Sequence, residues 1–274
     1  MDAFASVVSA AAAGLASFDS STLLVLAAIY TASAVFAGLS GFGFSAIGAL
    51  TLCWIPPQLG ICTLMLLSVF TQATELGALR RELRGQHANW RQGFVPYATG
   101  GVLGLPLGLE ILARAPSRGL ICALGSLLVA YAVYNAFKPR MLRLPACETC
   151  LATAFAVGAI GGIIGGFSAF PGGALVIWNG LKNVSKERGR AMTRPFILSM
   201  QVIALVIVAC ARPTVLLDPR LLALVLSSLP FAWAGNRIGI AIYRRTSQPS
   251  YRRVTLAALG VSGVSLVLKS VVFA

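Results

Sequence analysis

Long apolar segments recur along almost the whole of this chain, and their length constrains its fold more than any other feature. Apolar runs of about 20 residues follow one another from Leu23 onward, and each is long enough to cross a hydrocarbon layer of about 30 Å. Charged residues make up only 11% of the chain, whereas soluble domains carry about 25%. The sequence therefore predicts an all-α polytopic membrane protein, because a transmembrane β-barrel would show shorter, alternating segments.

The apolar residues group into eight segments that form two similar halves. We place the segments at residues 22–55, 59–79, 93–113, 119–137, 148–181, 195–211, 221–243 and 254–273. The first segment of each half is longer than the rest and is interrupted by glycines, near residues 38–45 and 161–173. We expect a single membrane domain made of two four-segment repeats, residues 1–145 and 146–274.

Residue identities support this internal repeat. When the second half is shifted back by 128 residues, four identical pairs align: Gly166 with Gly38, Ser168 with Ser40, Phe170 with Phe42, and Ala174 with Ala46. If one residue is inserted, Gln201 also aligns with Gln72.

The distribution of Lys and Arg favours a particular topology. If all eight segments crossed the membrane once, the basic loops 80–91 and 182–190 would face opposite sides, against the positive-inside rule. If each glycine-broken segment instead enters and returns on one side, as a re-entrant hairpin, fifteen Lys and Arg lie in cytoplasmic loops and four outside. This model predicts inverted repeats, an N-terminus outside, and a multi-pass protein of the inner (plasma) membrane. Two full but kinked spans are the alternative.

Interrupted helices at corresponding positions of two halves point to a transporter's binding site. Non-helical backbone at membrane depth must line a cavity or be buried in protein, and helix N-termini that follow such breaks favour anions. No carboxylate lies at either break, as a cation site would require. The alternative is that the glycines only permit close helix packing. The predicted substrate-binding residues at the breaks are small or hydroxylated: Ser40, Gly41, Gly43, Ser45, Ser168, Gly172 and Gly173.

Charged residues within apolar segments are costly in a bilayer and are therefore functional candidates. Arg194 and Arg237 are predicted to hold an anion through forked hydrogen bonds, the alternative being that their side chains reach the interface. Glu75 is a candidate for proton coupling, and its alternative is an ion pair with Arg80 or Arg81.

Several other classes of function lack their motifs. The net charge of +14 comes from short loops between apolar segments, so we do not expect nucleic acid as a partner. The chain has no Gly-x-Ser-x-Gly, HExxH or Walker A motif, and we expect no enzyme activity, cofactor or metal. Cys147 and Cys150 form one CxxC pair, a weak signal for a thiol-redox site.

The two glycine-rich runs resemble those of the sulfite exporter TauE/SafE family. Phe36 to Ala46 matches the first copy of the family's signature, and Gly162 to Ala174 matches the second. Phe44 and Ser45 stand where the first run would have glycines, and Pro171 interrupts the second. The resemblance implies the export or exchange of small sulfur-containing anions such as sulfite or sulfonates, and of other organic anions in some members.

Together these features predict a secondary transporter that alternates access to a midplane site between two hairpin tips. The expected partners are a small anionic substrate and the lipid bilayer, with proton coupling and a homodimer left open. Two other classes of function stay open at this point. One is a membrane thiol-redox carrier that uses the CxxC pair, and the other is a membrane scaffold that transports nothing.

Overall fold

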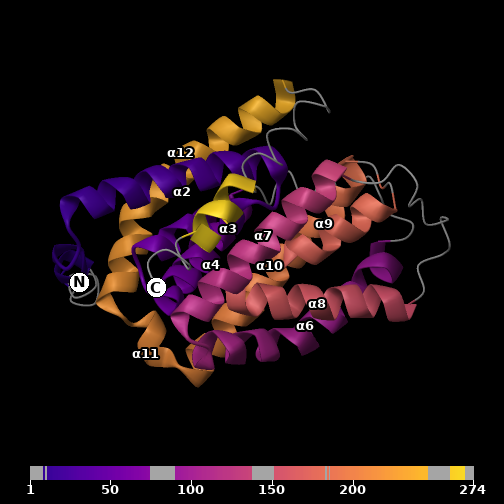
Figure 1. Ribbon diagram of the computed structural model, residues 1–274, viewed down its shortest axis with the longest axis horizontal. Coiled ribbons are helices and arrows are strands. Elements are labelled where there is room, and N and C mark those ends of the chain that lie inside the picture. Colours follow the sequence, from indigo (N-terminus) through magenta and orange to yellow (C-terminus); the bar gives the residue numbers. More distant parts are fainter. Residues whose placement is uncertain are drawn as a thin grey trace.

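The computed structural model describes residue 9 and residues 11–74, 90–137, 151–182, 184, 186–245 and 260–268. Within these residues the regular structure is helical and contains no strand (Figure 1). The all-α prediction is therefore confirmed for the described part of the chain. The principal helices are α2 (Ser20–Ser40), α3 (Phe44–Gly48), η1 (Ala49–Cys53), α4 (Pro57–Ala73), α6 (Trp90–Arg114), α7 (Ser117–Phe137), α8 (Leu151–Ser168), α9 (Gly172–Leu181), α10 (Lys186–Ala211), α11 (Pro213–Leu216) and α12 (Pro219–Arg245).

Five helices in the described residues are long and apolar enough to cross a membrane: Ser20–Ser40, Phe94–Arg114, Leu151–Ser168, Gly189–Ala211 and Pro219–Arg245. Their outer faces carry large apolar side chains. For example, Leu103 is 69% exposed and Leu24 is 73% exposed. Such faces are costly in water and suit a lipid environment.

The ends of α2 follow from local chemistry. Asp19 caps its N-terminus, where the carboxylate accepts a hydrogen bond from the Ser21 N–H at 3.2 Å. At the other end Gly41 adopts a left-handed conformation (φ +82°), and its N–H donates to the Ala37 carbonyl. Glycine suits this C-terminal position because it has no Cβ to collide with the backbone. The helix therefore ends at the first glycine of the predicted break.

Helix α10 begins earlier than predicted. The apolar segment starts at Pro195, whereas the helix starts at Lys186. The first turns of α10 are polar, so a prediction based on hydropathy does not include them in the apolar segment. As a result Arg190 and Arg194 lie one turn apart on the same side of α10.

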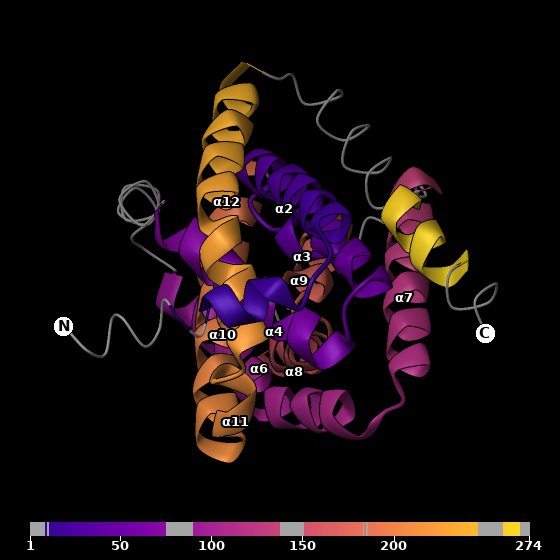
Figure 2. The ribbon, with the colours of Figure 1, turned by 90° about the vertical axis from the view of Figure 1, so that its left-hand side faces the viewer.

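Helices from the two halves of the chain pack together through glycines. Helix α6 packs along α8, where a Cβ on Gly162 would lie 2.1 Å from the Gly101 carbonyl oxygen. Helix α2 packs along α12 (Figure 2), where a Cβ on Gly239 would lie 2.1 Å from the Val35 carbonyl oxygen. Small residues allow this close approach of helix backbones. Many glycines of the chain therefore serve packing.

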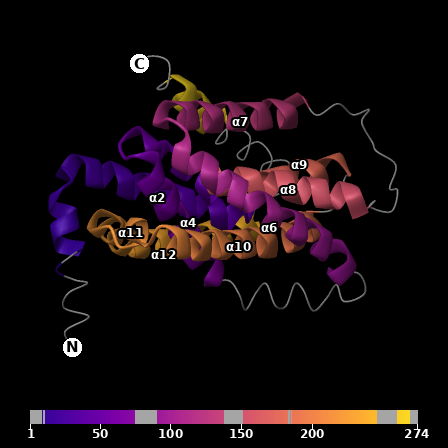
Figure 3. The ribbon, with the colours of Figure 1, turned by 90° about the horizontal axis from the view of Figure 1, so that it is seen from below.

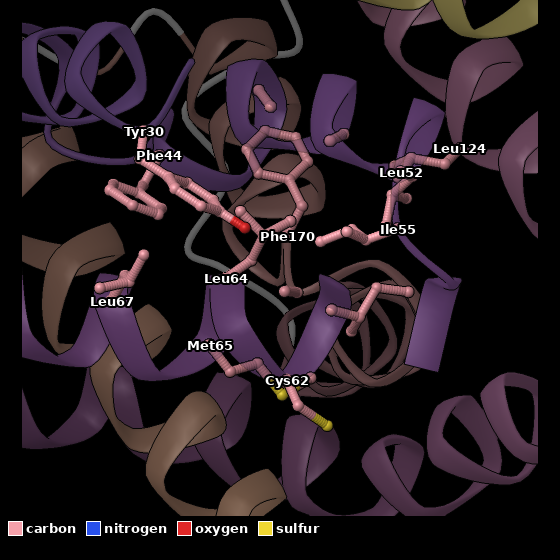
Figure 4. Packing of buried hydrophobic residues seen from close by; sticks show 14 of the residues in the cluster. Tyr30, Phe44, Leu52, Ile55, Cys62, Leu64, Met65, Leu67, Leu124 and Phe170 are labelled. Carbon is pink, nitrogen blue, oxygen red and sulfur yellow. The ribbon is translucent and has the colours of Figure 1, made fainter. Parts of the chain in front are cut away.

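A further contact between the two halves joins α7 to the helix at residues 260–268. The two helices lie side by side (Figures 2 and 3), and a Cβ on Gly263 would lie 2.7 Å from the Val129 nitrogen. The central core contains aromatic side chains from both halves, including Tyr30, Phe44 and Phe170 (Figure 4). This core surrounds the two helix breaks.

Candidate anion-binding site

Two short breaks separate α2 from α3 and α8 from α9. We call residues 40–43 the first tip and residues 168–171 the second tip. After the first tip, α3 packs against α2, and a Cβ on Gly48 would lie 3.4 Å from the Ser33 hydroxyl. After the second tip, α9 packs against α8.

The two tips share one local conformation. Gly41 has φ +82° and Ala169 has φ +56°, and these two residues correspond under the 128-residue shift. Ala169 is the one non-glycine residue with positive φ among those that the structure describes. Such a conformation costs about 1–2 kcal/mol for a residue with a Cβ, so the surrounding contacts must hold Ala169 in place.

At both tips a serine hydroxyl oxygen accepts hydrogen bonds from backbone N–H groups. The Ser40 hydroxyl oxygen accepts from the N–H groups of Phe42 (3.3 Å) and Gly43 (3.0 Å). The Ser168 hydroxyl oxygen accepts from the Phe170 N–H at 3.3 Å. Because these N–H groups already have partners, the tips offer fewer backbone donors to an anion than the sequence suggested. Side chains must supply more of the recognition.

The two breaks contact each other. The rings of Phe42 and Phe170, one from each tip, have centroids 6.3 Å apart. The hydroxyl of Ser45, on α3 just after the first tip, donates to the Ala169 carbonyl oxygen at 2.5 Å. Gln201 on α10 also donates to the Ala169 carbonyl, at 3.1 Å. The described residues therefore bring together the two breaks that are 128 positions apart in the sequence.

A cavity lies beside the first tip, between α2, α3, α4, α10 and α12. Among the described residues that line it, Arg194 is the one charged residue and none is a carboxylate. Arg194 is only 5% exposed. A Cβ on Gly41 would lie 3.0 Å from the Arg194 Nε, so the missing side chain at Gly41 leaves the guanidinium beside the tip. The lining consists of Ala37, Gly41, Phe42, Phe44, Ser68, Thr71, Gln72, Arg194 and Asn236.

A second arginine holds the end of α2. Arg190 donates to the carbonyl oxygens of Gly38 (3.1 Å) and Leu39 (3.4 Å). Its guanidinium carbon also lies 4.1 Å from the centroid of the Tyr243 ring on α12. The C-terminus of a helix carries partial negative charge, which would repel an anion at the first tip. Arg190 offsets this charge and fixes the position of the tip.

The structure brings some of the predicted site residues together and separates others. Gly41 and Arg194 line the cavity, Ser40 caps the first tip, and Ser45 joins it to the second. Arg237 lies elsewhere: it is exposed on α12, with its guanidinium carbon 5.7 Å from the Trp233 ring centroid.

The other predicted glycines and Ser168 pack against protein. A Cβ on Gly43 would lie 2.1 Å from the Phe36 ring, one on Gly172 would lie 2.6 Å from Ile197, and one on Gly173 would lie 2.8 Å from Phe170. The Ser168 hydroxyl donates to the Ile164 carbonyl. None of the four lines the cavity described above. Glu75, Cys147 and Cys150 lie outside the described residues.

Four polar residues that line the cavity were not among the predicted site residues. Three of them, Ser68, Thr71 and Gln72, are on α4, and the fourth, Asn236, is on α12. The three α4 residues are spaced three and four apart, a helical spacing that places them on one face. Polar residues at this helical spacing within an apolar segment are the sequence feature from which these three site residues could have been predicted.

The fold and the cavity define a class of protein. Apolar helices of membrane-spanning length surround a buried arginine and several polar side chains, an arrangement typical of a multi-pass membrane protein that handles a polar solute. The model of the sulfite exporter TauE/SafE family matches residues 24–266, nearly the whole chain, and the chain belongs to this family. No curated protein and no solved structure matches it. Membership implies a membrane transporter of the sulfite or anion exporter type rather than an enzyme.

Proposed function

We propose that this protein is a secondary transporter that exports small sulfur-containing or organic anions, such as sulfite or sulfonates. The observation that carries the proposal is the buried Arg194 beside Gly41, in a cavity whose described lining residues include no carboxylate. A guanidinium in the wall of a cavity keeps its charge at any physiological pH and favours an anionic over a cationic solute. Its planar set of N–H donors can bind an oxyanion through forked hydrogen bonds.

The proposed mechanism is alternating access around a midplane site between two re-entrant hairpins. The helix packing supports inverted repeats. The first hairpin packs on α12 of the second half through α2, and the second hairpin packs on α6 of the first half through α8. This exchange of partners is what a two-fold relation between the halves would produce. Movement of one half against the other would then open the site to each side in turn.

The proposed orientation follows from the loop charges. With both hairpins re-entrant, the basic loops face the cytoplasm, the N-terminus lies outside, and the protein lies in the inner membrane. The first hairpin then enters from outside and the second from the cytoplasm. Arg190, at the head of α10, would stabilise the first tip from the cytoplasmic side.

Flux measurements on reconstituted protein test the proposal. Purified full-length protein in proteoliposomes is expected to show saturable exchange of labelled sulfite or a short alkanesulfonate, and little exchange of a cation of similar size. Repeating the assay with and without a pH gradient tests proton coupling. Protein-dependent flux of none of the anions would contradict the proposed function, and flux that depends on Cys147 or Cys150 would favour the redox carrier.

A further inference from the structure

Two buried carboxamide oxygens belong to the cavity lining. The Gln72 Oε1 and the Asn236 Oδ1 have no hydrogen-bond partner among the described residues, and both residues line the cavity beside Arg194. Asn236 is only 1% exposed. Buried polar atoms in native proteins almost always have a partner. Two exceptions in one lining indicate that something else supplies a donor there.

The orientation of the Gln72 amide is determined by a chain of hydrogen bonds. The Gln201 Nε2 donates to the Ala169 carbonyl at 3.1 Å, so Gln201 must direct its Oε1 the other way. That Oε1 accepts from the Gln72 Nε2 at 3.3 Å, and the same nitrogen donates to the Ser68 hydroxyl at 3.2 Å. The Gln72 oxygen is therefore the atom left without a partner. Rotating the Gln72 amide by about 180° would place its oxygen against the Gln201 oxygen and remove the hydrogen bond between them.

The Asn236 amide is oriented in the same way. Its Nδ2 donates to the Thr71 carbonyl oxygen at 3.3 Å and to the Thr74 hydroxyl at 3.4 Å. A carbonyl oxygen can only accept, so the Asn236 nitrogen must face it and the oxygen must face away. Nearby, the Thr71 hydroxyl uses its proton on the Ser68 carbonyl at 2.9 Å. The lining thus pairs the cationic Arg194 with two acceptors that need donors.

We infer that the site takes an oxyanion that also carries a hydrogen-bond donor. This inference rests on the proposed function and narrows its substrate class. The negative group would bind Arg194, and an O–H or N–H group would donate to the Gln72 and Asn236 oxygens. An anion with acceptors only would leave both oxygens unpaired and would meet them with its own lone pairs. Sites built to hydrogen-bond a substrate group reject analogues that lack it.

Two sources share this chemistry. One is a protonated inorganic oxyanion, hydrogensulfite, and the other is a small sulfonate with a hydroxyl or ammonium group. They differ in their response to pH, because raising the pH removes the donor from hydrogensulfite and leaves a hydroxyl unchanged. The experiment therefore includes an arm for each.

Binding to purified full-length protein tests the inference with a matched pair of ligands. We expect 2-hydroxyethanesulfonate to bind at least about tenfold more tightly than ethanesulfonate, which has the same charge and nearly the same size. Gln72→Met and Asn236→Leu are each expected to narrow this ratio toward one by weakening only the hydroxylated ligand. Arg194→Gln is expected to weaken both ligands and to keep the ratio. In the second arm, binding of sulfite that falls as the pH rises, with 2-hydroxyethanesulfonate unaffected, identifies hydrogensulfite as a ligand.

Two outcomes would overturn the inference and leave the proposed function standing. The first is equal binding of the two sulfonates to the wild-type protein. The second is a preference for the hydroxyl that survives in both Gln72→Met and Asn236→Leu. If the wild-type protein binds no sulfonate and no sulfite, the proposed function fails together with the inference.

Discussion

Anion transport is expected to fall about 100-fold in Arg194→Gln, because the buried guanidinium is the one charged group in the cavity lining of the described residues. Glutamine keeps a polar side chain of similar reach but removes the charge and the forked donor. Arg194→Lys is expected to retain part of the activity, since it keeps the charge without the planar fork. The measurement is the initial rate of labelled anion exchange in proteoliposomes.

Arg237→Gln is the matched control for this prediction. Arg237 also lies within an apolar segment, but it is exposed and lies over Trp233. We expect its replacement to change the exchange rate by no more than about twofold, since it makes no contact with the cavity. Loss of transport in Arg237→Gln with normal transport in Arg194→Gln would place the site elsewhere.

The second large effect is expected at the first tip. Gly41→Leu should reduce transport about 100-fold in protein that still inserts into the membrane, because small displacements of binding groups can cost that much. Gly41 has φ +82°, and a Cβ there would lie 2.9 Å from the Arg190 Nε and 3.0 Å from the Arg194 Nε. A larger side chain would therefore displace both guanidinium groups and fill part of the cavity.

Gly189→Ala is the control for Gly41→Leu. Gly189 lies on α10 one residue before Arg190, but among the described residues a Cβ there would meet only the Asn179 side chain, at 3.7 Å. Transport by this variant is expected to stay near the wild-type rate. Comparing elution profiles in detergent separates loss of folding from loss of the site. A Gly41→Leu protein that folds normally and transports at the wild-type rate would remove the first tip from the site.

Much of the fold could be predicted because the helices that cross a bilayer are determined by the length of apolar segments and the charge of the loops, which can be read directly from the sequence. Segment length and loop charge located the apolar helices, and glycines located both breaks. Helix α10 was predicted too short because its first turns are polar. The membrane orientation, the re-entrant character of the hairpins and the inverted repeat remain proposals that the topology of the inserted protein must test.

The direction in which a side chain points around its helix was harder to predict. Asn236 and Arg237 are neighbours in sequence, and adjacent residues on a helix point about 100° apart. Asn236 is buried in the cavity lining and Arg237 is exposed. Arg237 was predicted to be a site residue because of its charge, although its neutral neighbour Asn236 is the one that lines the cavity. In an apolar helix without a polar face, no periodic pattern distinguishes the two positions.

Some residues that are equivalent under the internal repeat contact each other in the structure. Gln72 and Gln201 were aligned as equivalent residues, and in the structure they are hydrogen-bonded to each other. Phe42 and Phe170 were aligned in the same way, and their rings lie together. Residues related by a two-fold axis meet when they lie near that axis. Both contacts agree with such a relation between the halves, but the alignment alone does not indicate which equivalent pairs meet.

Protection of a cysteine in the cavity tests the central claim, an anion site beside the first tip, most directly. Ala37 lines the cavity, so a protein whose only cysteine is Ala37→Cys can be labelled with a thiol reagent with and without 2-hydroxyethanesulfonate. A protein that keeps only the exposed Cys210 is the control. We predict that the anion slows labelling at position 37, leaves Cys210 labelling unchanged, and loses its effect when Arg194→Gln is added. Equal labelling at position 37 with and without the anion would contradict the account.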